Sequence, residues 1–365
     1  MDLFHTHISE SSIERVTQAL RSTFVSEGKL VREFEATLSA QLELIRPAAV
    51  NSGTSALHLA LDLAGVGPGD EVILPAQTFI ATGLVILQQR ATPVFADIDP
   101  MTGNLNPESL LHKITPRTRA VMPVHWAGYP CDLDEINAIA RENRIVVIED
   151  AAHALGATYR GKPIGAISRL TAFSFQAIKQ LTTGDGGALC CLDERDSRLA
   201  FTRRWFGIDR ANDKPDVLGE RVYNIDHVGY KYHMNDLAAA VGLGNLHDFP
   251  HRLARRRAIA ARYRQELEDT PGLTLLREDS DRESAYWVFT VRVEGRVDFI
   301  RKLAGHGIPA SVVHLRIDRH SVFGGTREDL PGQAAFNADQ VAIPVHEGLS
   351  DDEVEQVITH VRKGW

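Results

Sequence analysis

The sequence has little cysteine, and none of its cysteines has the spacing of metal ligands. Its 365 residues include only Cys131, Cys190 and Cys191, and the last two stand side by side in an apolar run. Such thiols are typical of small core residues in a reduced compartment. We therefore expect no disulfide framework and no metal site.

The sequence also lacks a targeting segment, a long apolar run and an excess of positive charge. Its start, MDLFHTHISESS, contains neither a basic segment nor an apolar run, so it does not resemble a signal peptide. No apolar stretch is long enough to cross a bilayer. The net charge of −8 argues against nucleic acid or an anionic membrane as the main partner. We expect a cytoplasmic protein that binds neither.

What is present is an alternation of short apolar runs and amphipathic segments. Helical patterns stand between several of the runs, which are rich in β-formers. This order predicts an α/β fold with a mostly parallel sheet that helices cover on both faces. The predicted strands are 71–75, 92–98, 119–125, 145–151, 170–175 and 187–192.

The pattern changes near residue 248. A very basic helix is predicted over 249–269, with apolar residues at helical spacing and most of its arginines on a solvated face. Since 365 residues exceed one typical core, we predict a large domain over 1–248 and a small α+β domain over 249–365. The later elements expected are strands at 285–293 and 309–315 and helices at 297–307 and 351–365.

Several small and polar residues sit at the strand ends of the predicted sheet, where ligands bind in open α/β folds. The turn NSGTSAL, residues 51–57, opens a helix. Gly53 lets the backbone approach a ligand, and Thr54 and Ser55 offer hydroxyl and N–H groups for an anion. Taken alone, this turn is more simply explained as a Ser/Thr helix cap.

A carboxylate pair and an aromatic ring stand at two further strand ends. Glu149 and Asp150 end the predicted strand 145–151, and His153 follows one helical turn later. A buried carboxylate needs donors or a cation, so Asp150 is either a cap or an acid that faces a cationic ring nitrogen. Phenylalanine is most often a core residue, and Phe79 is expected to be one. However, its polar neighbours at a strand end also allow it to stack on a ligand.

Lys179 stands just before a Thr-Thr-Gly-Asp-Gly-Gly turn between two apolar runs. A desolvated lysine amine can form a Schiff base with a carbonyl compound. An anion cradle, an acid, an aromatic ring and this lysine, in this order on one α/β chain, indicate a pyridoxal-phosphate site. Without the other elements, Lys179 would be interpreted as a side chain that reaches solvent.

Six motifs give the sequence a family resemblance over nearly its whole length. They are NSGTSALHLAL, GDEVILPAQTFIAT, VHWAG, IEDAAHALGA, FSFQAIKQLTTGDGGA and GYKYHMNDLAAAVG. The chain resembles the sugar aminotransferases of the DegT/DnrJ/EryC1/StrS group, which are fold type I pyridoxal-phosphate enzymes related in fold to aspartate aminotransferase.

The resemblance implies a role for each motif residue. Lys179 would form the Schiff base with the cofactor and then move protons. Asp150 would pair with the pyridinium nitrogen, Phe79 would stack on the ring, and His153 would lie near its phenolic oxygen. The residues implied at the phosphate are Gly53, Thr54, Ser55 and Ser174. Members of the group are typically homodimers whose sites are completed by the partner subunit.

Two segments depart from the family pattern. Lys231, in GYKYH, replaces an asparagine that reaches the partner's phosphate, and a lysine can serve there as a point charge. The segment HLRIDRH, residues 314–320, replaces a proline-rich pattern that contributes to the substrate side. An arginine there suits an anion, although a solvated loop with a local Asp318 ion pair is the alternative. The candidate substrate residues are His314, Arg316, Arg319 and His320.

The resemblance implies an aminotransferase of class EC 2.6.1, in amino-sugar biosynthesis for a surface polysaccharide or a glycosylated metabolite. It would move an amino group, from L-glutamate, to a keto group of a nucleotide-linked deoxysugar. Lys179 favours transamination over the dehydration of a subgroup that has histidine there. Two alternatives stay open: an enzyme of the same fold that acts on an amino acid or amino-cyclitol, and a non-enzymatic regulator.

Overall fold

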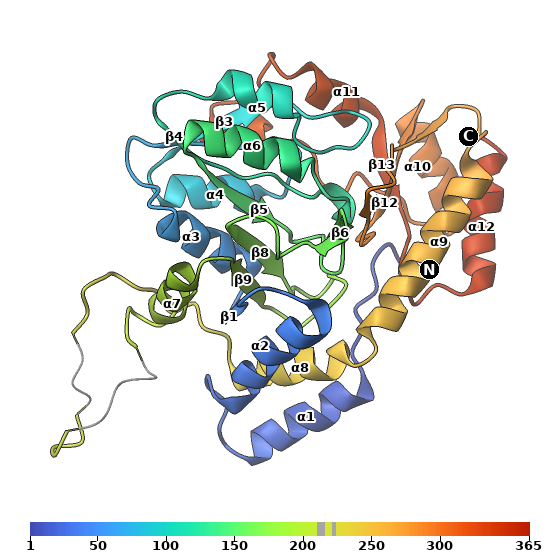
Figure 1. Ribbon diagram of the computed structural model, residues 1–365. Helices are drawn as coiled ribbons and strands as arrows, with labels where there is room; N and C mark the ends of the chain where they lie inside the picture. Colours follow the sequence, from blue (N-terminus) through green and yellow to red (C-terminus); the bar gives the residue numbers. More distant parts are fainter. Residues whose placement is uncertain (210–215, 221–223) are drawn as a thin grey trace.

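The computed structural model describes residues 1–209, 216–220 and 224–365, and a seven-stranded sheet forms its centre (Figure 1). The strand order is β1-β9-β8-β5-β4-β2-β3. Neighbouring strands are parallel except at β9, which runs antiparallel to β1 and β8. The predicted mostly parallel sheet is confirmed. Its strands are β1 (Ala48–Val50), β2 (Glu71–Pro75), β3 (Thr92–Ala96), β4 (Thr118–Val121), β5 (Val146–Asp150), β8 (Leu170–Ser174) and β9 (Gly187–Cys191).

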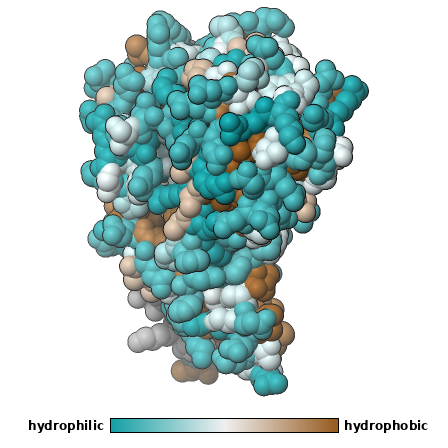
Figure 2. Space-filling view, turned by 90° about the vertical axis from the view of Figure 1, so that its right-hand side faces the viewer, coloured by the Kyte–Doolittle hydropathy of each residue, from teal (hydrophilic) through white to brown (hydrophobic). Residues whose placement is uncertain are grey.

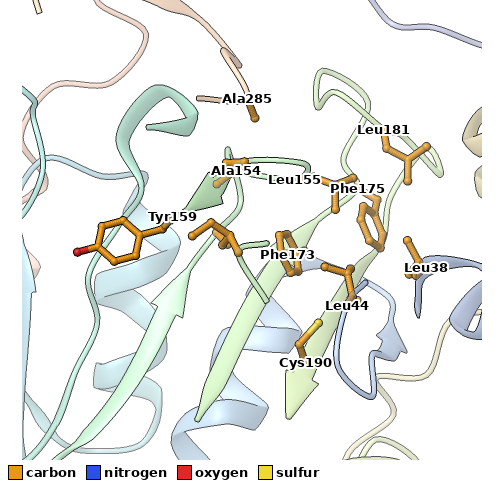
Figure 3. Close-up of a cluster of buried hydrophobic side chains, with 14 of the residues drawn as sticks. Leu38, Leu44, Ala154, Leu155, Tyr159, Phe173, Phe175, Leu181, Cys190 and Ala285 are labelled. Atoms are coloured by element: carbon orange, nitrogen blue, oxygen red, sulfur yellow. The ribbon is translucent and has the colours of Figure 1, made fainter. Parts of the chain in front are cut away.

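Helices cover both faces of this sheet, because side chains alternate along each strand between two apolar layers. Phe173 and Cys190 join one layer, shown in Figure 3, while Cys191 joins the other. Helices α2, α5, α6 and α8 pack on the first layer, and α3, α4 and α7 on the second. Their bounds are α2 (Lys29–Leu42), α3 (Gly53–Leu63), α4 (Ile80–Gln88), α5 (Pro107–Lys113), α6 (Leu133–Asn143), α7 (Glu194–Arg203) and α8 (Asp236–Leu246).

Helix α8 is apolar on more than one face because α1 (Glu10–Arg21) and α2 cover it within the same chain. A methyl group at Gly244 would lie 2.3 Å from the backbone nitrogen of Ser12 in α1. A methyl group at Gly242 would lie 2.6 Å from the Phe34 ring of α2. Such close approach needs glycine. The apolarity of α8 therefore reflects core packing and gives no support for a subunit interface.

A second apolar core lies around the three-stranded sheet β10-β12-β13 of the C-terminal part. Helices α9, α10 and α12 pack on it. Because α9 begins at Phe249, we keep the domain boundary near residue 248 as a proposal. The remaining elements include α9 (Phe249–Leu267), α10 (Arg296–Ala304), α11 (Pro331–Asp339), α12 (Asp351–Arg362), β10 (Leu273–Leu275), β12 (Phe289–Val293) and β13 (Gln340–Ile343), with a small sheet of β6 (Thr158–Tyr159), β7 (Lys162–Pro163) and β11 (Arg282–Glu283).

The strand predicted over 309–315 is wrong, because this segment lies beside β13 without joining the sheet as a strand. Ser311 makes one isolated bridge, and Val313 has a φ of +51°, which is incompatible with an extended strand. The side-chain amide of Gln340 donates to the carbonyls on either side of Val313, each at 3.1 Å. Side-chain hydrogen bonds thus replace a backbone ladder here.

The prediction of solvated arginines on α9 holds for the four that are partly exposed, but it fails for the other two. Arg252 and Arg256 are 5% and 2% exposed. Arg252 donates to the carbonyls of Gln180, at 2.7 Å, and Asn245, at 2.6 Å. Arg256 donates to the carbonyl of Val345 at 2.9 Å. The buried guanidinium groups have backbone acceptors, so they join the two parts of the chain.

The face that carries α9, α10 and α12 is mostly hydrophilic, with apolar residues in small groups (Figure 2). Scattered apolar residues of this kind are normal on a protein surface. Among the helices of the described ranges, none combines the length and the apolarity that crossing a membrane requires.

Candidate active site

The carboxyl ends of β1, β2, β5 and β8 reach one edge of the sheet, and a cavity of about 320 Å³ opens there. A larger hollow of about 570 Å³, beside α1 and α2, holds none of the candidate residues. The structure therefore brings together side chains that the sequence separates widely. The predicted residues that line the cavity are Gly53, Thr54, Phe79, Asp150, His153, Ser174, Lys179 and His314. The predicted residues outside its lining are Ser55, Lys231, Arg316, Arg319 and His320.

The turn between β1 and α3 forms an anion cradle at the start of a helix. A methyl group at Gly53 would lie 2.8 Å from the Cβ atom of Ser174, so glycine permits the two strand ends to meet. Within the described ranges, no acceptor is recorded for the backbone N–H groups of Gly53 and Thr54. These groups remain available for an anion at a positive helix end.

Ser55 is turned away from this cradle, and Ser52 takes the capping role. Ser52 Oγ accepts the backbone N–H of Ser55 at 3.0 Å. The Ser55 hydroxyl donates to the side-chain oxygen of Asn51 at 2.6 Å. Ser52 lines the cavity, whereas Ser55 does not. The sequence motif thus locates the cradle correctly, while the geometry favours its backbone over the Ser55 hydroxyl.

Asp150 is buried at the end of β5, with only 5% of its surface exposed. The Thr82 hydroxyl donates to Oδ2 at 2.7 Å, and the N–H of Ala152 donates to Oδ1 at 3.2 Å. Burial raises the pKa of Asp150, while these hydrogen bonds and the charge of Lys179 act in the opposite direction. A carboxylate held by two donors in an apolar cavity is suited to a cationic partner.

The loop between β8 and β9 carries Lys179 to the same cavity. Its backbone N–H donates to the carbonyl of Gln176 at 2.9 Å. Burial lowers the pKa of Lys179 to about 7, although the charge of Asp150 raises it. The Nζ atom lies 3.8 Å from the ring centre of Trp287. Near neutral pH, a large fraction of this amine is therefore the neutral nucleophile.

Two histidines and a phenylalanine complete the wall. Burial holds the pKa of His153 well below its usual range, and its buried Nδ1 has no hydrogen-bond partner within the described ranges. Burial, followed by the charge of Lys179, lowers the pKa of His314 to about 4. Phe79 is 53% exposed, and its ring centre lies 5.2 Å from that of His314. The wall thus offers neutral imidazoles and an open aromatic face.

The other residues of the 314–320 segment form a local ion pair or lie outside the cavity. Arg316 is 6% exposed and donates to both oxygens of Asp318, at 2.7 and 2.6 Å. Asp318 is completely buried. Arg319 is exposed and His320 is half-buried. The geometry matches the alternative of a local ion pair, so we do not carry the anion-binding role of these residues further.

Lys231 is exposed, and its backbone forms a bridge with Trp205. Its predicted role concerns the site of a partner subunit. One chain provides no test of that role, so the assignment stays a prediction.

The sequence interpretation missed three residues of the site: Ser52, Thr82 and Trp287. Ser52 and Thr82 lie inside quoted motifs, and a hydroxyl residue at the start of a helix after a strand is a usable signal. Trp287 gives no such signal. Its indole N–H donates, at 2.9 Å, to the carbonyl of Ile178, 109 residues earlier in the chain.

One group of three residues in the described ranges has metal-ligand geometry, and it lies outside the cavity. The ligand atoms of His5, His7 and Glu347 lie within 4.8 Å of one another. However, Arg256 Nη2 already lies 2.8 Å from Glu347 Oε2, and His7 Nε2 lies 3.1 Å from an oxygen of Asp248. Because Arg256 already compensates the carboxylate of Glu347, we interpret the group as an anchor for the N-terminal segment.

The cavity residues fit pyridoxal phosphate. The unbonded N–H groups at the start of α3 and the Ser174 hydroxyl suit a phosphate. Asp150 suits a ring nitrogen that carries a proton, and the unpaired Nδ1 of His153 suits a polar group on the ring. Lys179 supplies the amine that binds a carbonyl carbon. All of these groups line one cavity. A cofactor site requires this proximity, which the sequence alone could only suggest.

Comparison with known proteins identifies the group to which this arrangement belongs. The spore coat polysaccharide biosynthesis protein SpsC of Bacillus subtilis is 38% identical, over 97% of this chain and 94% of that protein. GDP-perosamine synthase of Caulobacter vibrioides is 36% identical, over 94% of this chain and 92% of that protein. Both relatives match almost from end to end.

Solved structures agree with the sequence relatives. The sugar aminotransferase CalS13 of Micromonospora echinospora is 36% identical, with a TM-score of 0.95 over 100% of both chains. Spr1654 of Streptococcus pneumoniae, solved in PLP and PMP forms, is 31% identical, with a TM-score of 0.92 over 100% of this chain and 98% of that one.

The model of the DegT/DnrJ/EryC1/StrS aminotransferase family matches residues 6–362, which is nearly the whole chain. The fold is accordingly that of the fold type I enzymes, and the cofactor is pyridoxal phosphate. The resemblance inferred from the six sequence motifs is thereby confirmed. On its sequence, its fold and its cavity, this chain belongs to the DegT/DnrJ/EryC1/StrS aminotransferase family.

Proposed function

We propose that this protein transfers an amino group, from glutamate, to a keto group of a nucleotide-linked deoxysugar. The observation that carries the proposal is geometric: the amine of Lys179 and the buried carboxylate of Asp150 line the same cavity. The sugar aminotransferase relatives support the sugar as acceptor.

The chain's own residues divide the chemistry between binding and proton transfer. When bound, pyridoxal phosphate supplies a carbonyl carbon for amines and a ring that accepts electrons. The start of α3 and Ser174 would hold its phosphate. Asp150, fixed by Thr82, would keep a proton on the ring nitrogen. The Nζ atom of Lys179 would accept a proton from the donor's α-carbon and deliver it to the former carbonyl carbon, and in the reverse half-reaction it would take that proton back and donate it to the acceptor carbon.

The pKa of Lys179 suits this double use. A general acid-base group acts best when its pKa lies near the working pH, because both protonation states are then populated. Burial provides the shift from the usual range of lysine to about 7. A fully solvated lysine would remain protonated and could neither attack a carbonyl nor accept a proton.

We also propose that the active form is a homodimer. Between α7 and α8, the described residues 216–220 project from the body of the chain (Figure 1), and Val217 and Leu218 are 102% and 83% exposed, while Val228 is 79% exposed. Exposed apolar residues on an extended segment favour a partner surface. Lys231 lies close by in the sequence, which supports its predicted reach toward a partner's phosphate.

The test is a half-reaction experiment with purified protein loaded with pyridoxal phosphate. Glutamate alone should convert the absorption band of the cofactor in a single turnover, and a suitable nucleotide-linked ketosugar should restore it. A panel of such sugars, simple keto acids and amino-cyclitol ketones identifies the acceptor. Restoration only by keto acids or cyclitol ketones would support the first alternative. A band that no amino donor converts would support the regulator.

A further inference from the structure

Trp287 joins the small domain to the lysine loop, and no step derived above uses it. The residue is 1% exposed and comes from the segment just before β12. Its backbone N–H donates to the carbonyl of Ala127 at 2.8 Å, and its indole N–H donates to the carbonyl of Ile178 at 2.9 Å. Ile178 immediately precedes Lys179. Two hydrogen bonds to the large domain therefore fix the orientation of the indole beside the lysine.

The indole is the close partner of the lysine amine. Lys179 Nζ lies 3.8 Å from the ring centre, and no hydrogen bond or ion pair of Nζ is recorded within the described ranges. A cation over an indole face is attracted by the negative centre of the ring, and the attraction is strongest where water is excluded. Burial in the cavity disfavours the protonated amine of Lys179, and the face of the Trp287 indole partly offsets this by stabilising the positive charge.

We propose that the face of Trp287 is the resting position of the Lys179 amine whenever that amine is not joined to the cofactor. The ring holds Nζ in the cavity and stabilises the ammonium that results when Nζ accepts a proton from the substrate. Trp287 is then a positioning residue, since it acts through Lys179. The inference rests on the proposed function because it takes Lys179 as the catalytic amine.

A resting position matters because the lysine side chain is a flexible stem of four carbons. A released amine that samples many positions is seldom aligned with the reacting carbon. Alignment of reacting groups accounts for a large part of the rate enhancement by enzymes. The indole offers one position that belongs to the same cavity wall. It also connects that position to the small domain, from which Trp287 comes.

A purely structural role for Trp287 is the alternative. The His153 ring stacks on the indole, with centres 3.8 Å apart and planes at 15°. The Phe4 ring stacks on it with centres 5.2 Å apart. Packing of this kind predicts a loss of stability when Trp287 is replaced. It does not predict a change in the pH at which Lys179 loses its proton, and that difference provides the test.

The experiment compares Trp287→Leu with Trp287→Phe in cofactor-free protein. Both variants lose the hydrogen bond to Ile178 and some volume, but only the phenylalanine keeps an aromatic face. The measurement is the rate at which each protein captures pyridoxal phosphate between pH 5 and pH 9, followed by absorbance. Capture needs the neutral amine, so the rate rises with pH through the pKa of Lys179, which is about 7 in the native chain.

If the aromatic face is lost while Lys179 stays buried, the pH midpoint of cofactor capture should fall. For a desolvated cation–π contact, we expect a fall of about one pH unit in Trp287→Leu, a tenfold change in the equilibrium. Trp287→Phe should stay within a few tenths of a unit of the native midpoint. The high-pH plateau should fall in both variants, because both lose the anchor to Ile178. The ionisations of the cofactor itself are common to all the proteins compared.

The controls separate this inference from the proposed function. Phe4→Leu removes a ring that packs on the indole and should leave the midpoint unchanged. If the native protein captures no cofactor, the proposed function fails. If it does capture the cofactor and the midpoint in Trp287→Leu stays in place or rises, the resting position alone is overturned. Trp287→Met, whose flexible side chain fills irregular space, replaces the leucine variant should that one not fold.

Discussion

The strand-end wall of the cavity, which includes Asp150, His153 and Lys179, and the neighbouring segment 315–320 both carry polar groups, but these groups are paired differently in the two regions. In the wall, N–H groups at the start of α3 and the Nδ1 atom of His153 have no partner within the described ranges. In the segment, Arg316 and Asp318 satisfy each other through two hydrogen bonds. A polar group near a site is therefore a good candidate for ligand binding when the fold leaves it unsatisfied, and a poor one when the fold pairs it.

The sharpest test of the strand-end wall is the replacement of its lysine. Lys179→Ala should lower turnover by at least about 10³-fold, because it removes both the nucleophile and a general base. The cofactor should still bind without a covalent link, through the cradle. The measurement is the steady-state rate together with cofactor retention on dialysis. Lys162→Ala, at an exposed position in β7, is the control, and near-normal turnover in Lys179→Ala would refute the role.

The carboxylate of the wall should have the next largest effect. Asp150→Asn keeps the shape but cannot balance a positive ring nitrogen, so we expect a loss of about 10²–10³-fold in kcat with the fold intact. Thr82→Val removes the hydrogen bond to Oδ2, together with the contact of its hydroxyl to Thr78, but keeps the carboxylate, so it should cost about tenfold or less. Single-turnover rates check both variants. An Asp150→Asn rate no lower than that of Thr82→Val would contradict the assignment.

Replacement of Arg316 tests the segment in which the polar groups are paired with each other. Arg316→Ala leaves the carboxylate of Asp318 buried without its cation, so it should destabilise the protein by about 3–5 kcal/mol. Arg319→Ala, at an exposed position, should change stability by less than about 0.5 kcal/mol. Urea denaturation measures both. A stable Arg316→Ala with a raised KM for the sugar would restore the anion-binding role that the geometry disfavours.

Ser55 gives the smallest expected effect within the cradle motif. Its hydroxyl donates to Asn51 rather than into the cavity, so Ser55→Ala should cost about 1 kcal/mol of stability or less. The dissociation constant for pyridoxal phosphate should remain within about twofold, since backbone N–H groups form the cradle. Fluorescence titration of the cofactor provides the measurement. A loss of tenfold or more would return Ser55 to the phosphate site.

Much of the fold could be predicted from the sequence because its signals are local. The run EVILP forms β2 over the predicted residues, and the helix predicted from residue 249 begins there. The errors occur where distant side chains decide the outcome. Gln340 bonds the carbonyls beside Val313 and prevents the strand expected there. The buried arginines of α9 have acceptors contributed by other parts of the chain, which no helical periodicity can show.

By itself, the sequence determined the mostly parallel sheet, the family, the helix-opening turn of Gly53, the strand end of Asp150 and the loop of Lys179. Short-range patterns suffice for this, because a strand end followed by a turn has the same local chemistry wherever it lies. Only the tertiary structure decided that Trp287 reaches Lys179, that Thr82 holds Asp150, and that Arg316 turns to Asp318 instead of the cavity. The first two contacts join residues far apart in the chain, and the third depends on burial, so each is set by the packing of the whole fold.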